Sequence, residues 1–230
     1  MLYIGAKETF TATMTMSDNS TKPITGGVWG SDASGVAIVV PATGEVTILS
    51  SGMAHIFVDY QGLQGSKLIR GLPNYQGVWS GIYFVDSCSA SLSWSSTGCN
   101  EFPVNKSYPI GFDLTQNRDR VQSTIHMGAI SGETSGTIDK NGALPLTYLL
   151  SAPPWSIDAW STIISVTPGQ ATGYISLTFQ ASGYTGAIRV ETTIRYLNRT
   201  SSIAGTSFGC YTAQTSGPTI HDLIRLLAGR

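Results

Sequence analysis

Charged residues are scarce in this sequence. Its 230 residues include only 13 lysines and arginines and 14 aspartates and glutamates, for a net charge of −1. A nucleic-acid-binding surface needs concentrated positive charge to neutralise phosphates, so this composition argues against a nucleic-acid partner. No apolar run approaches the roughly 18 residues of a membrane-spanning helix, and we therefore expect no membrane span.

The residues that favour long helices, such as Ala, Leu, Glu and Lys, do not dominate either. Instead the chain holds 28 serines, 26 threonines and 26 glycines. Hydrophobic residues make up 41% of the chain and aromatic residues 10%, which is enough to drive collapse and argues against disorder. This balance predicts an all-β protein.

Cysteine and signal-peptide features are also sparse. Of the three cysteines, Cys88 and Cys99 lie eleven residues apart around a Ser/Gly-rich loop, where a disulfide would stabilise by about 2–3 kcal/mol. The alternative is two unpaired apolar thiols, and Cys210 is expected to be a buried thiol. No Cys/His spacing indicates zinc, and no cofactor is implied. The first five residues lack signal-peptide features, so the protein is cytosolic or the chain begins inside a longer exported protein.

Alternation of apolar and polar residues with a period of two runs through most of the chain. Short strands are expected around 36–40, 45–49, 55–60 and 67–70, which is the rhythm of a small sandwich. The break at Gly71-Leu72-Pro73-Asn74 predicts a boundary between a domain of residues 1–72 and a domain of residues 73–230.

Eight longer strands follow this boundary. Their short connections favour an up-and-down antiparallel barrel, because closure removes exposed sheet edges. Two longer connections are expected, over Ser87–Ser107 and Ser151–Asp158. A C-terminal helix is expected over Thr219–Gly229, with an apolar stripe that docks on the domain or, alternatively, binds a partner. The expected barrel strands are 77–87, 108–116, 120–128, 133–140, 143–150, 160–166, 173–180 and 186–197, with a short ninth near 207–211.

The first domain resembles the bacterial Ig-like group 2 family. The matching motifs, in order, are Val28-Trp29-Gly30-Ser31-Asp32, Val36-Ala37-Ile38-Val39, Gly44-Glu45-Val46-Thr47 and Ser51-Gly52-Met53-Ala54-His55-Ile56. They span roughly residues 3–70, and Gly30 stands where the family usually has serine. The resemblance implies an extracellular or cell-surface spacer or adhesin module without catalytic residues.

The second domain is similar to the lipocalins. Gly77-Val78-Trp79 at the start of the first barrel strand matches the family's Gly-x-Trp motif, and a long first loop and a helix after the last strand agree with it. The resemblance implies that Arg195 packs over Trp79, although the family's Thr-Asp-Trp motif is absent.

Candidate catalytic groups are few. Of the histidines, only His126 lies on a barrel strand, and its alternation with Ile125 and Met127 places it outside. Asp113 and Glu133 are the candidate carboxylate pair, and Asp113 is expected to be solvated. No nucleophile elbow, phosphate loop or zinc-protease motif is present.

The apolar register of the barrel strands predicts its interior. An eight-stranded barrel either fills this space with side chains or holds one small ligand. Trp94 and Trp155, on the long connections, would stack on a ligand or sugar or else plug a barrel end. The expected inward apolar residues are Tyr83, Phe112, Leu114, Ile125, Met127, Leu146, Tyr148, Ile164, Leu177, Phe179 and Ile194, and the polar residues in register with them are Gln116, Ser123, Thr162 and Thr192.

We therefore interpret the chain as a small Ig-like β-sandwich followed by a lipocalin-like barrel with a C-terminal helix. The leading hypothesis is a non-enzymatic bacterial protein, extracellular, at the cell surface or periplasmic, whose barrel binds a small apolar ligand or a cell-surface or carbohydrate partner. One alternative is a cyclase- or isomerase-type enzyme using Tyr83, Tyr148 and Gln116. Another is a purely structural or adhesive protein with a solid barrel. The candidate ligand-binding residues are Tyr83, Phe112, Gln116, Met127, Tyr148, Phe179, Ile194, Trp94 and Trp155.

Overall fold

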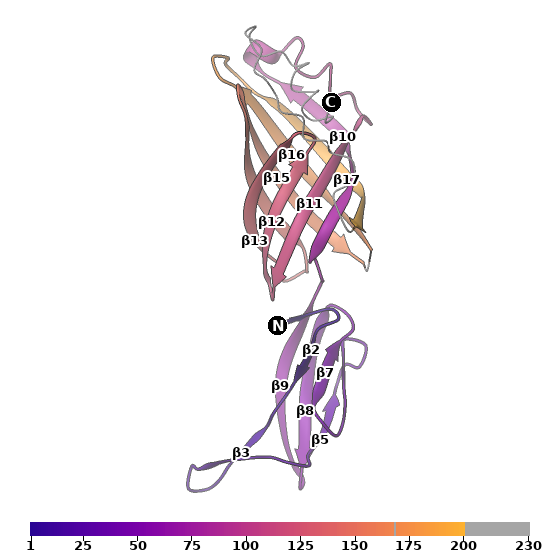
Figure 1. Ribbon diagram of the computed structural model, residues 1–230, viewed down its shortest axis with the longest axis vertical. Coiled ribbons are helices and arrows are strands. Elements are labelled where there is room, and N and C mark those ends of the chain that lie inside the picture. Colours follow the sequence, from indigo (N-terminus) through magenta and orange to yellow (C-terminus); the bar gives the residue numbers. More distant parts are fainter. Residues whose placement is uncertain (168, 201–230) are drawn as a thin grey trace. The chain divides into compact units, whose positions relative to one another are not determined.

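The computed structural model describes residues 1–167 and 169–200 and is all-β in class. The chain divides into two compact units, residues 1–74 and residues 75–230 (Figure 1). The expected helix over Thr219–Gly229, the short ninth strand and Cys210 lie outside the described residues. Within the described ranges, no helix is long and apolar enough to cross a membrane.

Unit 1 consists of short strands in three sheets. A four-stranded sheet has the order β1-β9-β8-β5, a three-stranded sheet the order β2-β7-β6, and β3 and β4 form a separate hairpin. The β1–β9 pair is parallel and the other pairs are antiparallel. The strands are β1 (Leu2–Tyr3), β2 (Lys7–Thr9), β3 (Thr13–Thr15), β4 (Thr21–Pro23), β5 (Val28–Ser31), β6 (Ala37–Val39), β7 (Glu45–Ile48), β8 (Gly52–Tyr60) and β9 (Leu63–Leu72).

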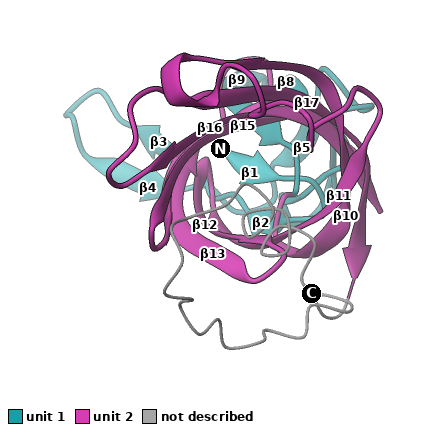
Figure 2. Cartoon of the chain, turned by 90° about the horizontal axis from the view of Figure 1, so that it is seen from above, with its two compact units in different colours: residues 1–74 teal, residues 75–230 magenta. Residues whose placement is uncertain are grey.

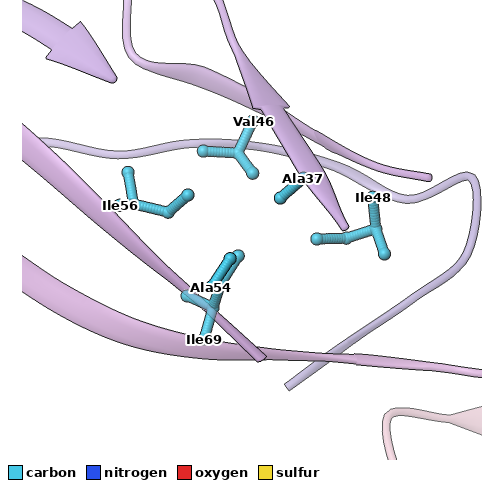
Figure 3. Packing of buried hydrophobic residues seen from close by; sticks show 6 residues of the cluster. All are labelled: Ala37, Val46, Ile48, Ala54, Ile56 and Ile69. Atoms are coloured by element: carbon cyan, nitrogen blue, oxygen red, sulfur yellow. The ribbon is translucent and has the colours of Figure 1, made fainter. Parts of the chain in front are cut away.

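The core of unit 1 lies between the three-stranded and the four-stranded sheet. Alternate residues of β7 and β8 point into it, as the period-two pattern predicts. Ala37, Val46 and Ile48 from β6 and β7 face Ala54 and Ile56 from β8 across this space (Figure 3). The first unit therefore has a core of its own.

Unit 2 is one eight-stranded antiparallel sheet of order β13-β12-β11-β10-β17-β16-β15-β14, which curls into a nearly closed barrel (Figure 2). The first strand, β10, pairs with the eighth, β17. The edge strands β13 and β14 lie side by side. Their closeness is seen at Gly136 of β13, where an added Cβ would lie 2.5 Å from the carbonyl oxygen of Pro145 of β14. The strands are β10 (Gly77–Ala90), β11 (Ser107–Asn117), β12 (Arg120–Met127), β13 (Ile130–Thr137), β14 (Leu144–Ala152), β15 (Trp155–Val166), β16 (Gln170–Ala181) and β17 (Ile188–Thr200).

The structure corrects two details of the expected strands. The long connection over Ser151–Asp158 is instead a tight hairpin, in which β14 runs to Ala152, β15 begins at Trp155 and Pro153-Pro154 forms the turn. Ile164 was expected inside the barrel but is 54% exposed. The buried face of β15 is the one that carries Trp155, Ile157, Ala159, Ser161 and Ile163, so Ile164 falls on the outer face.

Candidate functional site

The barrel interior contains the side chains that the sequence register predicts there. The predicted apolar residues on β10–β17, Ile164 apart, are buried, and so are the polar residues Gln116, Ser123, Thr162 and Thr192. The candidate ligand-binding residues on these strands, namely Tyr83, Phe112, Gln116, Met127, Tyr148, Phe179 and Ile194, are thus gathered within one barrel. Whether they form a pocket depends on what fills the space between them.

Aromatic side chains from opposite walls meet inside the barrel. Phe112 on β11 and Tyr148 on β14 have ring centroids 6.5 Å apart, although β12 and β13 separate their strands in the sheet. Phe102, from the connection between β10 and β11, is 1% exposed and stacks on Phe179 of β16 at 5.3 Å. Phe102 also lies 5.9 Å from Tyr108 of β11. These contacts occupy the space that a ligand would need.

Tyr75 closes the end of the barrel where β10 begins. Its hydroxyl donates to the carbonyl oxygens of Gly142 at 2.6 Å and Ile163 at 3.2 Å. Its backbone N–H donates to Oε1 of Gln116 at 2.7 Å. Gln116, a predicted ligand-binding residue, is therefore already engaged by the protein. Sequence reasoning missed Tyr75, because a residue between two units carries no periodic pattern.

Trp79 packs beside Tyr75 and pairs with a different arginine from the expected one. The guanidinium carbon of Arg199 lies 4.7 Å from the Trp79 ring centroid, whereas that of Arg195 lies 4.9 Å from the ring of Phe84. Trp79 and Arg199 are direct register partners in the β10–β17 pair. The Arg195–Trp79 contact that the lipocalin resemblance implies is therefore wrong, because Arg199, four residues further along β17, is the residue paired with Trp79.

The connection between β10 and β11 closes the other end of the barrel. A disulfide joins Cys88 and Cys99 within it. Trp94, in the short 3-10 helix η1 (Leu92–Trp94), is 5% exposed and lies 5.2 Å from Trp155 and 5.0 Å from Tyr184, measured between ring centroids. Trp155 is 2% exposed. The burial of both tryptophans fits the role of a plug at the barrel end rather than that of a stacking surface for a ligand or sugar.

Tyr83 and Tyr148 each bury a phenol hydroxyl in the barrel interior. The hydroxyls of Tyr148 and Ser123 are 2.5 Å apart, whereas the Tyr83 hydroxyl has no hydrogen-bond partner among the described residues. Burial raises the pKa of Tyr83 and of Tyr148 above the ordinary tyrosine value. Both phenols are therefore held neutral, which disfavours them as proton-accepting bases.

An acidic cleft of about 560 Å³ lies on the outer wall over β11, β12 and β13. Asp113, Thr124 and Glu133 form one register row across these strands. Asp113 also contacts Nε2 of His126 at 3.2 Å, and its side chain is 47% exposed, as the sequence predicted for a solvated carboxylate. In the described ranges, no group of three or more His, Cys, Asp or Glu side chains could hold a metal ion.

A second cleft, of about 580 Å³, lies at the barrel end that Trp94 closes, and we call it the rim cleft. It runs between the β14–β15 hairpin and the loop that joins β16 to β17. The sequence did not predict this cleft, because Trp155 is the only one of the predicted ligand-binding residues that lines it. Its lining includes Ser151, Pro153, Pro154, Ser156, Gln180 and Tyr184.

No protein-family model and no curated protein matches the chain. Among solved structures, the chain is similar to domains 5–6 of the S-layer protein SbsC, with a TM-score of 0.26 and 16% identity over 83% of this chain and 90% of that one. It is also similar to SbsC domains 4–9, with a TM-score of 0.27 and 13% identity over 80% of this chain and 42% of that one. Function must therefore be inferred from the chain's own geometry.

Proposed function

We propose that this chain is a non-enzymatic structural or adhesive protein of the cell surface, in which the barrel is a solid body. The filled barrel interior carries this proposal. Phe112 meets Tyr148 and Phe102 meets Phe179 across the interior, while Tyr75 and Trp94 close its two ends. A container for an apolar ligand would need that space empty.

The disulfide supports an exported location. Disulfides persist in oxidising compartments such as the bacterial periplasm and cell surface and are rare in the cytosol. The Cys88–Cys99 bridge secures the connection that closes the barrel, so an oxidising compartment favours this closed form. We place the protein outside the bacterial cytoplasm on this ground.

The first unit fits the role of a spacer, and the barrel fits that of the domain that the spacer displays at the cell surface. We propose residues 1–72 as a bacterial Ig-like group 2 spacer, since the motif residues Trp29, Val36 and Val46 all belong to or pack against the unit 1 core. We propose residues 73–230 as a barrel of lipocalin-like strand order, supported by the β10–β17 pairing and the Trp79–Arg199 contact.

Titration with the apolar fluorescent probe 1-anilinonaphthalene-8-sulfonate tests the solid barrel. We expect no saturable binding to the wild-type chain. Phe179→Ala and Tyr148→Ala open internal cavities of about benzene size, too small for the sulfonate probe, so each folded variant is expected to gain binding of benzene but not of the sulfonate. Leu149→Ala is the matched control, because Leu149 adjoins Tyr148 but is 71% exposed. Saturable binding to the wild type that both interior variants abolish would instead establish a ligand-binding barrel.

A further inference from the structure

We propose that the rim cleft binds a neutral carbohydrate, which would be the adhesive partner of the barrel. The volume of about 580 Å³ lies within the range of about 300–1,000 Å³ typical of small-molecule sites. The inference rests on the proposed adhesive function and names its partner class. It does not depend on the interior being solid, because the cleft opens to the outside of the barrel end.

The floor of the rim cleft is a row of uncharged hydrogen-bonding side chains. Ser151 on β14 is the register partner of Ser156 on β15, and Ser156 is the partner of Gln180 on β16. Neighbouring strands lie about 4.8 Å apart, so two hydroxyls and one amide follow one another at a regular spacing. Together they can donate to and accept from several ligand hydroxyls.

Tyr184 supplies an aromatic face on one wall. Its ring stacks on Trp94 with an interplanar angle of 28°, yet Tyr184 remains 44% exposed where it lines the cleft. The ring is therefore supported by Trp94 and still has exposed area that a ligand can contact. Aromatic side chains combine a large apolar area with little conformational freedom, which suits them to stacking on the apolar face of a sugar ring.

The disulfide-bonded connection holds this wall in place. The N–H of Ser91 donates to the carbonyl oxygen of Ala187 at 3.1 Å, and the N–H of Ser93 donates to that of Thr185 at 3.2 Å. A Cβ on Gly186 would overlap the carbonyl oxygen of Ser91, so the two segments are in close contact. On the opposite wall, the N–H of Ser182 donates to the carbonyl oxygen of Pro154 at 2.9 Å. The cleft is thus a preformed site.

The chemistry of the lining selects the ligand class. Among the described residues, no charged side chain lines the cleft, so an ionic ligand would lose its hydration without a counter-charge. A purely apolar ligand would leave Ser151, Ser156 and Gln180 without partners. A neutral polyhydroxylated molecule satisfies both conditions.

Isothermal titration of the full chain with neutral oligosaccharides tests this site. The probes are the pentasaccharides of glucose, mannose and N-acetylglucosamine, with oligogalacturonate as the acidic comparison and oligoproline as the peptide comparison. We expect saturable binding of at least one neutral probe. Tyr184→Ala and Gln180→Ala should each weaken it by about tenfold or more, and Tyr184→Phe should retain it.

The matched control is Tyr174→Ala, which removes another exposed tyrosine from β16, outside the cleft lining, and should leave binding unchanged. Gln180→Ala keeps the test valid if Tyr184→Ala disturbs folding, because Gln180 is exposed. The proposal is overturned if no neutral probe binds, if only oligogalacturonate or oligoproline binds, or if binding survives both cleft variants. None of these outcomes bears on the solid interior, which the apolar-probe titration tests separately.

Discussion

At the scale of single residues, two buried tyrosine hydroxyls of the barrel differ in their hydrogen bonding. The Tyr83 hydroxyl has no partner among the described residues, whereas that of Tyr148 pairs with Ser123. An unsatisfied buried hydroxyl destabilises a fold by about 1–3 kcal/mol, and a satisfied one contributes about 1 kcal/mol. We therefore expect Tyr83→Phe to raise the free energy of unfolding by at least about 1 kcal/mol and Tyr148→Phe to lower it by about 1 kcal/mol.

Urea denaturation followed by tryptophan fluorescence compares the two variants, and each serves as the other's control. A loss of stability in Tyr83→Phe equal to that in Tyr148→Phe would mean that the Tyr83 hydroxyl is bonded in solution, for example to a buried water molecule.

The same tyrosines predict an alkaline limit of stability. Burial raises the pKa of Tyr83 and Tyr148, and raises that of Tyr108 to about 12. The folded state therefore favours the neutral phenol. The resulting stability is complete below the unfolded-state pKa of about 10 and is lost as pH rises from there towards the folded-state pKa.

We expect the free energy of unfolding to fall by about 1.4 kcal/mol per pH unit for each such tyrosine above about pH 10. Absorbance of the phenolate at 295 nm, compared with the chain in urea, checks this. Full ionisation of all tyrosines before the tertiary circular dichroism signal changes would contradict it. Tyr83→Phe should make the decline shallower.

At the scale of elements, the period-two pattern located the strands because each has one buried and one solvated face. It failed at Ile164, because Ile163 and Ile164 are both apolar and alternation alone does not decide which of them faces the interior. The Arg195 expectation came from the lipocalin resemblance and not from the alternation, and Arg199 lies over Trp79 instead. The buried residues Tyr75 and Phe102 come from irregular segments, where no alternation exists to reveal burial.

Close contact between β10 and β17, next to the register shift at Ile82/Tyr83, predicts a glycine that does not tolerate substitution. A Cβ on Gly81 of β10 would overlap the backbone carbonyl of Tyr196, which cannot move aside as a side chain could. We expect Gly81→Ala to destabilise the barrel by about 1–3 kcal/mol or more. Gly169→Ala is the control, because a Cβ there meets nothing within 4 Å. Equal midpoints of chemical denaturation for the two variants would contradict the β10–β17 register.

The connection between β10 and β11 depends on its disulfide. Opening the bridge between Cys88 and Cys99 releases a loop of about 11 residues, and the chain-entropy model gives a loss of about 2–3 kcal/mol. The double variant Cys88→Ser/Cys99→Ser should show this loss in guanidinium denaturation under oxidising conditions. Reducing agent should lower the wild-type stability by a similar amount and leave the variant unchanged. A variant as stable as the oxidised wild type would contradict a structural role for the bridge.

At the scale of the whole molecule, the sequence predicted which side chains share the barrel interior but not whether space remains between them. That depends on residues far apart in the chain, such as Phe102 against Phe179 and Tyr75 against Gly142. The rim cleft escaped prediction for the same reason. Ser151, Ser156 and Gln180 are ordinary outward residues in their own strands, and only the pairing register places them in one row.

The separate cores predict that each unit folds by itself. The unit 1 core, which includes Val46 and Ile56, draws only on residues 1–74, and the barrel core is built from residues 75 onward. We therefore propose that the chain can be divided between residues 74 and 75, and expect fragment 75–230 to unfold at the same urea midpoint as the barrel in the full chain.

Tryptophan fluorescence can isolate the barrel in this comparison. Of the five tryptophans, only Trp29 belongs to unit 1, so a Trp29→Phe full-length chain reports on the barrel alone. Its unfolding curve is compared with that of fragment 75–230. A fragment that is unfolded, or whose midpoint is clearly lower, would show that the barrel draws stability from residues 1–74, and the two units would then be one folding unit despite their separate cores.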